Sequence, residues 1–441
     1  MLQEITRENI GRIREPVFRE YAEMYLGIAE GFREQVEQFG LPFHSDPADA
    51  QETKELIARL KERPEISARC DDASFVYNWI SSACEACKQG VGTVTSYISF
   101  RCHRNCFFCF NPNQDNYEAH RIEKNDPRTE LRQIKASGSV LTHIALTGGE
   151  PLLHPEEAVA FFAAARSLFP EAHLRLYTSG DLLTEELLAS LRDAGLGEIR
   201  FSYKMEDPPA LQEKVLANMA LARKYIPAVM VEMPVMPDKE EEMRTLLLKL
   251  DDIGVRGINL LELCFPYHNA EAFRARGFEL KDPPYRTLYN FWYAGGLPIA
   301  GSELVSLRLL EFAADRQLSL GVHTCSLENK NFGQMYHQNK ILAPHHPTML
   351  FSEQDYYLKT AKAFGADALA VKKLFDKRGT RYLYDSSAGY IQFHPADAAR
   401  LMGRSVELAL SVNVLEERDG DVITRELKLL RADAGDLAQI Y

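Results

Sequence analysis

Apolar side chains follow a helical period in the first part of the chain. From residue 18 onward they recur at steps of three and four residues, which places them along one face of an amphipathic helix. The stripe consists of Phe18, Tyr21, Tyr25, Ile28, Phe32, Val36 and Phe39. We therefore predict a helical N-terminal extension over residues 1–90.

From residue 93 the pattern changes to short β-rich runs separated by amphipathic stretches. The runs are TVTSYISF (93–100), THIALT (142–147), LRLY (174–177), EIRFSYK (198–204), AVMVEMP (228–234) and GINLLEL (257–263), with LSLGVHT (318–324) as a candidate seventh. Six repeats of a strand followed by a helix predict a parallel sheet with right-handed crossovers. The expected fold class is α/β, with a partial (β/α)6-type barrel over residues 91–344.

A third pattern follows residue 345. The run YYLKTAKAFG (356–365) predicts a helix, and the runs RYLYD, GYIQFHP, VELALSVNVLEE and DVITRELKLL predict an antiparallel sheet. The DGD at 419–421 is typical of a hairpin turn. We predict a small α+β C-terminal module over residues 345–441.

Composition and charge narrow the class of protein. The chain has 441 residues, 46 % of them apolar, and a net charge of −12. This acidic balance argues against nucleic acid or an anionic membrane as a partner. Because no run of 18 apolar residues occurs and MLQEITRENIGRIREP lacks the apolar core of a secretory signal, we expect a soluble, cytoplasmic protein.

The eight cysteines are clustered along the chain. They stand at positions 70, 84, 87, 102, 106, 109, 264 and 325. Cys102, Cys106 and Cys109 form a C-x3-C-x2-C pattern after the first predicted strand. Three thiolates on one loop can hold three irons of a 4Fe–4S cluster and leave the fourth iron open. A zinc site that includes His103, or a chance cluster of buried cysteines, remains an alternative.

The spacing C-x3-C-x-aromatic-C, with Phe108 as the aromatic residue, is followed by a strand that ends in TGGEP (147–151). In this order the two motifs resemble the radical S-adenosylmethionine (SAM) superfamily over about residues 93–325. The resemblance implies that the three cysteines bind a 4Fe–4S cluster and that Phe108 lies near the adenine of SAM. It also implies that Gly148, Gly149, Glu150 and Pro151 form the pocket for the methionine amino group.

Other motifs resemble the branch that contains pyruvate formate-lyase activating enzyme and related activases of glycyl-radical enzymes. CFFCFNP is similar to their cysteine run, and TSG, with Ser179, is similar to their TNG turn. FSYKME and FPYHN imply SAM contacts for Lys204 and His268. The match departs at Tyr177, where those proteins have an aspartate. A solvated lysine and an ordinary loop histidine are the alternatives for Lys204 and His268.

The resemblance implies reductive cleavage of SAM to a 5′-deoxyadenosyl radical, which abstracts hydrogen from a small-molecule or peptide substrate. The electron would come from an external donor such as flavodoxin or ferredoxin. One alternative is an activase of a glycyl-radical enzyme. The other is a non-catalytic iron–sulfur or zinc scaffold or sensor.

The remaining cysteines allow two further hypotheses. Cys84, Cys87, Cys264 and Cys325 could hold a second cluster or a zinc ion, or they could be a CxxC pair and two core cysteines. Cys325 could instead donate a hydrogen atom to a substrate radical. It lies in the polar segment 323–339, which we expect to be a loop that contacts substrate, with the C-terminal module positioning it. The alternative is that the module only completes the core.

Overall fold

The computed structural model describes residues 2–44, 47–287, 289 and 295–440. The chain divides into two compact units. The barrel unit comprises residues 41–284 and 291–331, and the second unit comprises residues 1–40, 285–290 and 332–441. This division differs from the predicted boundaries at 90 and 345, because the first 40 residues join the C-terminal part of the chain.

The barrel unit contains a nine-stranded sheet in the order β2-β3-β12-β9-β8-β7-β6-β5-β4. Its parallel strands are β4 Thr93–Tyr97, β5 His143–Thr147, β6 His173–Thr178, β7 Glu198–Phe201, β8 Ala228–Val235, β9 Gly257–Glu262 and β12 Gly321–Cys325. The sheet ends at β4 on one side and at the hairpin of β2 Ile66–Arg69 and β3 Ser74–Tyr77 on the other. The predicted partial barrel, with its seventh strand, is therefore confirmed.

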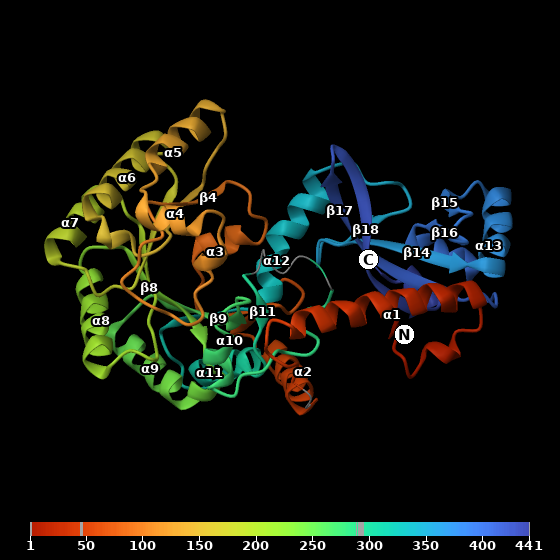
Figure 1. Cartoon of the computed structure of the whole chain (residues 1–441), viewed down its shortest axis with the longest axis horizontal. Coiled ribbons are helices and arrows are strands. Elements are labelled where there is room, and N and C mark those ends of the chain that lie inside the picture. The colour runs from red at the N-terminus through yellow and green to blue at the C-terminus, as the bar shows by residue number, and fades with distance from the viewer. Residues whose placement is uncertain (1, 45–46, 288, 290–294, 441) are drawn as a thin grey trace. The chain divides into compact units, whose positions relative to one another are not determined.

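Helices cover one face of this sheet, as Figure 1 shows for α5 to α9. They are α5 Pro127–Ala136, α6 Pro155–Leu168, α7 Glu185–Asp193, α8 Pro209–Ala222 and α9 Glu240–Ile253, with α11 Ser302–Asp315 before β12. Alternate strand residues, such as Leu174 and Leu176 of β6, join the apolar core under the helices. The residues that alternate with them, Arg175 and Tyr177, consequently face the inside of the barrel, the lumen.

The predicted all-helical extension over 1–90 is wrong in its second half. Helix α2 (Ala48–Lys61) is followed by the β2-β3 hairpin, and short helix α3 (Ser82–Cys87) precedes β4. Residues Cys70, Asp71 and Asp72 of the hairpin turn all have positive φ angles. No glycine or proline marks this turn in the sequence, so the hairpin gave little local signal.

The second unit is built on an antiparallel sheet in the order β1-β18-β17-β14-β16-β15, with β13 paired to β14. The strands are β1 Gln3–Glu4, β13 Leu350–Phe351, β14 Leu358–Phe364, β15 Tyr382–Asp385, β16 Tyr390–Phe393, β17 Leu408–Arg418 and β18 Asp421–Ala432. The helix predicted at 356–365 is wrong: the segment is β14, between two neighbouring strands, and helix α13 is Gly365–Arg378. The DGD hairpin is confirmed, with positive φ at both Asp419 and Gly420.

One further expectation is wrong, and the predicted N-terminal helix is confirmed for its stripe except Phe39, which follows the helix. The segment 323–339 is not an irregular loop, because β12 leads into helix α12 (Leu327–Tyr336) and a π-helix at His337–Ile341. The N-terminal stripe belongs to helix α1 (Pro16–Glu37), whose Phe18, Ala22 and Leu26 pack with Phe364 of β14. A truncation after residue 345 would therefore expose the apolar face of α1.

The helices of the described chain include none that combines the length and the apolar character needed to cross a membrane.

The packing of α1 generates a prediction. Phe18 is fully buried and stacks on Phe364 with ring centroids 4.6 Å apart. Phe18→Ala should lower the free energy of unfolding of the second unit by about 3–5 kcal/mol, because the truncation leaves a cavity. Met24→Ala on the same helix, where 56 % of the side chain is exposed, should change it by less than about 0.5 kcal/mol. Equal denaturation midpoints for the two variants would contradict this packing.

Candidate active site

A cavity of about 470 Å³ lies at the carboxyl ends of the parallel strands, inside the barrel unit. Ten of the residues predicted for the cluster and SAM line it: Cys102, Cys106, Phe108, Cys109, Gly148, Gly149, Glu150, Ser179, Lys204 and His268. Pro151 does not line the cavity; it is buried and begins a 3-10 helix. The predicted residues thus meet at one edge of the barrel, where parallel β/α folds place their sites.

Side-chain contacts with four neighbouring turns hold the cysteine loop, residues 98–110, in place. The Asn111 amide donates to the Gly148 carbonyl at 2.6 Å, and His268 Nε2 donates to the Cys109 carbonyl at 2.8 Å. Arg104 forms an ion pair with Asp207 and lies 3.6 Å from Asp181. These contacts tie the cysteine loop to the turns after β5, β6, β7 and β9.

The glycines of the TGGEP turn are needed for close backbone packing. A Cβ atom on Gly149 would lie 2.1 Å from the Arg101 carbonyl oxygen, and Gly148 has a φ of +107°. Backbone hydrogen bonds join Gly149 to Ser99 and Glu150 to Arg101 at 2.9 Å each. Glycine therefore lets this turn approach the cysteine loop, in addition to any role toward a ligand.

Glu150 is 2 % exposed and accepts four hydrogen bonds. The donors are the Leu152 amide, the Thr178 hydroxyl, and the amide and hydroxyl of Ser179, at 2.6–3.1 Å. The Ser179 hydroxyl also lies 2.5 Å from Asp181 Oδ1, yet its single proton serves only one carboxylate at a time. The group consequently has room for another donor, which suits a ligand ammonium.

Lys204 places a buried positive charge beside the three thiols. Its Nζ donates to the carbonyl and hydroxyl oxygens of Ser202, and within the described chain no carboxylate lies within ion-pair distance of it. A buried cation without a countercharge is costly, so this position favours an anionic ligand.

The chemistry of the three thiols fits an iron–sulfur cluster. Burial raises the pKa of Cys102, Cys109 and Cys106, the last to about 11, while the Lys204 charge opposes the rise. Metal binding must therefore displace their protons. Over the described ranges no three Cys, His, Asp or Glu side chains converge on a single-ion site. In a 4Fe–4S cluster each cysteine binds a different iron, and His103 is engaged with Asp181 at 2.8 Å.

The second metal site stays a prediction, and its cysteines have the following surroundings. The Cys84 thiol accepts hydrogen bonds from Arg200 at 3.4 Å and from Asn259 at 3.1 Å, inside the barrel. Cys264 lines the main cavity and its thiol faces the Gly295 carbonyl. These contacts engage the two cysteines separately, and Cys87 lies on α3.

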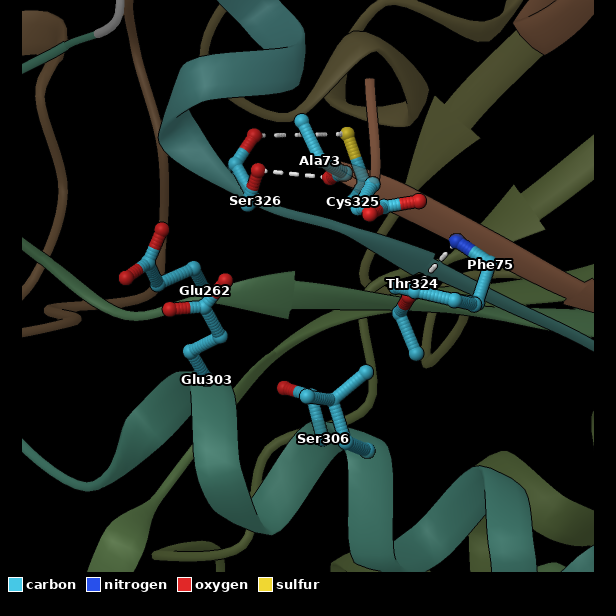
Figure 2. Close-up of a pocket in the computed structure, with 10 residues that line it drawn as sticks. Ala73, Phe75, Glu262, Glu303, Ser306, Thr324, Cys325 and Ser326 are labelled. Atoms are coloured by element: carbon cyan, nitrogen blue, oxygen red, sulfur yellow. Dashed lines mark hydrogen bonds between the residues drawn. The ribbon is translucent and has the colours of Figure 1, made fainter. Parts of the chain in front are cut away.

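Cys325 lies on a smaller cavity of about 10 Å³ in the barrel unit, shown in Figure 2 with Glu262, Glu303 and Ser326. Its thiol accepts a hydrogen bond from Asn329 at 3.2 Å, and burial raises its pKa to about 12. Cys325 is not among the residues that line the main cavity. Its role as a hydrogen-atom donor stays a prediction that this position does not favour.

Several residues of the main cavity were missed at the sequence level. They are Thr95, Arg104, Asn111, Tyr177 and Glu232. The alternation of side chains along each strand could have identified Thr95, Tyr177 and Glu232, because polar residues at inward positions of barrel strands are unusual in a packed core. Cys264, predicted as a ligand of a second metal site, and Lys330, from the segment predicted to contact substrate, also line the main cavity.

Comparison with known proteins agrees with this site. Residues 96–250, which include the cysteine loop and the TGGEP turn, match the model of the Radical SAM superfamily. This region, about a third of the chain, is therefore similar to a radical SAM domain.

Individual relatives cover the chain only in part. A protein of Methanocaldococcus jannaschii named "Putative glycyl-radical enzyme activating enzyme" is 30% identical over 248 residues, which are 54% of this chain and 62% of the relative. GTP 3',8-cyclase of Microcystis aeruginosa is 41% identical over 78 residues, 18% of this chain and 23% of that protein. The chain thus spans less than two thirds of either relative.

Among solved structures, Streptococcus suis SuiB bound to the precursor peptide SuiA is similar at 13% identity. The TM-score is 0.39, and the match covers 69% of this chain and 62% of that chain.

The contact between Gly149 and Arg101 generates a prediction. Gly149→Ala should lower the free energy of unfolding of the barrel unit by about 1–3 kcal/mol, the usual cost of overpacking, and displace the cysteine loop. Gly197→Ala is the matched control, because its Cβ would meet its nearest atom at 3.5 Å, and it should cost less than about 1 kcal/mol. Denaturant titration measures both. A Gly149 variant as stable as the control would show that the turn does not need glycine there.

Proposed function

We propose that this protein is a radical SAM enzyme that cleaves SAM reductively at a 4Fe–4S cluster and abstracts hydrogen from a substrate. The observation that carries the proposal is the shared cavity, in which three thiols of one loop lie with the buried Lys204 and with Glu150. The match of residues 96–250 to the superfamily supports the same reading.

Cys102, Cys106 and Cys109 would hold the cluster. When bound, the reduced cluster supplies the electron that splits SAM into methionine and a 5′-deoxyadenosyl radical. Lys204 suits the methionine carboxylate, while Glu150 and Asp181 around the Ser179 hydroxyl suit the ammonium. Phe108 presents an aromatic ring to the same cavity, where an adenine could stack.

The chain's own residues would then orient the reaction. His268 and Asn111 fix the cysteine loop against the turns that carry the SAM contacts. Because these loops enclose the cavity, a reactive species formed there is held near its target and away from bulk water. An external electron donor such as flavodoxin or ferredoxin belongs to this proposal.

A second candidate is an activase, which would take hydrogen from a glycine of a partner protein. The 30% identity to the Methanocaldococcus jannaschii protein favours it. A glycyl-radical signal in an added glycyl-radical enzyme, detected by electron paramagnetic resonance after incubation with SAM and reductant, would identify this activity. Turnover of a small molecule without such a signal would exclude it.

SAM cleavage is the direct test of the proposed function. Anaerobically reconstituted protein should release 5′-deoxyadenosine when it receives SAM and dithionite. The Cys102→Ala/Cys106→Ala/Cys109→Ala variant should release none, because the cluster has lost its ligands. Cys70→Ala, which changes a buried cysteine outside the cavity, should behave as wild type. Fully loaded wild-type protein that forms no 5′-deoxyadenosine would refute the proposal.

A second prediction separates SAM binding from cluster binding. Lys204→Met should weaken SAM binding by about 1.5–3 kcal/mol, the range for a hydrogen bond to a charged group, and leave the iron content unchanged. Lys224→Met, at an exposed lysine of the same unit, is the control and should bind SAM normally. Calorimetric titration with SAM measures both. Normal affinity in the Lys204 variant would place the SAM carboxylate elsewhere.

A further inference from the structure

The lumen of the barrel contains a buried arginine that has no ion-pair partner in the described chain. Arg175 of β6 is 8 % exposed, and its Nε and Nη1 atoms are enclosed and make no hydrogen bond among the described residues. No ion pair of Arg175 occurs in the described part of the chain. An unpaired charge in such a position is costly unless a ligand compensates it.

Arg200 of β7, the next strand, also lies in the lumen, but its three guanidinium nitrogens all have partners. Its Nε pairs with Glu198 and its Nη1 with Glu232, both at 2.5 Å. Its Nη2 donates to the Ser81 hydroxyl at 3.0 Å. Glu198 and Glu232 therefore both form ion pairs with Arg200. Neither forms one with Arg175, so the charge of Arg175 is not compensated by a carboxylate of the described chain.

The main cavity comes close to Arg175 on the side of β5 and β4. In the sheet register Arg175 pairs with Glu198 of β7 on one side and with Ala145 of β5 on the other, and Ala145 in turn pairs with Thr95 of β4. Thr95 is exposed and lines the main cavity.

Two other groups connect Arg175 to the proposed reaction site. The Tyr177 ring lies 5.8 Å from the Arg175 guanidinium carbon. Tyr177 lines the main cavity and lies two residues nearer than Arg175 to the carboxyl end of β6, where the SAM residues are. Glu232 also lines the cavity; its Oε2 accepts from Arg200 and Asn259, and its Oε1 has no partner among the described residues. The lumen thus offers a cationic group, an aromatic ring and a carboxylate acceptor beside that site.

We propose that the lumen is the substrate site and that Arg175 binds an oxyanion group, a carboxylate or a phosphate, of a small-molecule substrate. The inference rests on the proposed function for the identity of the reaction, although the anion site itself does not. Glu232 Oε1 would accept a hydrogen bond from a hydroxyl or amino group of the same substrate. The carbon that loses hydrogen would then lie beside Tyr177, between the anchored anion and SAM.

Anion binding by the reconstituted protein tests this proposal, with inorganic phosphate and acetate as probes in the absence of SAM. Calorimetric titration should show one saturable site for at least one probe, and the stronger probe identifies the anion class. Arg175→Met should lower that affinity by about tenfold to a hundredfold, because it removes charge-assisted hydrogen bonds, and Arg175→Lys should restore part of it. Arg132→Met, at an exposed arginine of α5, controls for general salt effects and should bind normally.

The outcomes separate this site from the proposed function. Release of 5′-deoxyadenosine from SAM with dithionite is measured on wild type and on Arg132→Met, so SAM cleavage is assessed without a change at the anion site. No saturable binding of either probe by wild type, or equal affinity in Arg175→Met, would overturn the anion site even if SAM is cleaved. If Arg175→Met does not fold, crystals soaked in bromide decide: anomalous density at the guanidinium supports the site, and none there overturns it.

Discussion

The approach of the Gly149 backbone to the Arg101 carbonyl is the contact on which the candidate site depends. It extends the pairing of β4 and β5 beyond the ends of both strands, through hydrogen bonds from Gly149 to Ser99 and from Glu150 to Arg101. The cysteine loop is therefore anchored at its start by backbone geometry and at its end by the Asn111 bond to Gly148. As a result, three thiols and the carboxylate of Glu150 face one cavity, although they come from different strands.

Charge organises the rest of the barrel interior. At the rim, Lys204 leaves a positive charge beside the thiols, and Asp181 and Glu150 compete for one serine proton. Deeper in the lumen, Glu198 has a pKa lowered to about 2 by the His173, Arg200 and Ser81 interactions that outweigh its burial. His323, enclosed by Ser74 and Asn259, has a pKa lowered to about 3 by burial and is neutral. Such polar filling is expensive in a core and is typical of a site that binds ligands.

The sequence predicted the parts of this picture that depend on local spacing. The cysteine pattern, the TGGEP turn and the strand–helix repeat each act within a few residues, and the DGD hairpin depends on two residues that accept positive φ. The packing of Phe18 on Phe364 joins positions 346 residues apart, so the pattern of α1 could not reveal its partner, and β14 was taken for a helix. Likewise, the motif predicted Glu150 as a contact of the SAM amino group but not the four protein donors that surround it. Arg175 has no ion pair because Glu198 and Glu232 both pair with Arg200. This arrangement joins side chains of different strands, so no local sequence pattern could predict it.

The central claim is that the cluster and SAM share the cavity formed by the cysteine loop and the TGGEP turn. Electron–nuclear double resonance on the reduced protein, with SAM isotopically labelled at its amino nitrogen, tests this claim most directly. The account predicts a coupling between the labelled nitrogen and the cluster spin in wild type. A reduced 4Fe–4S protein that binds SAM with no such coupling would contradict it.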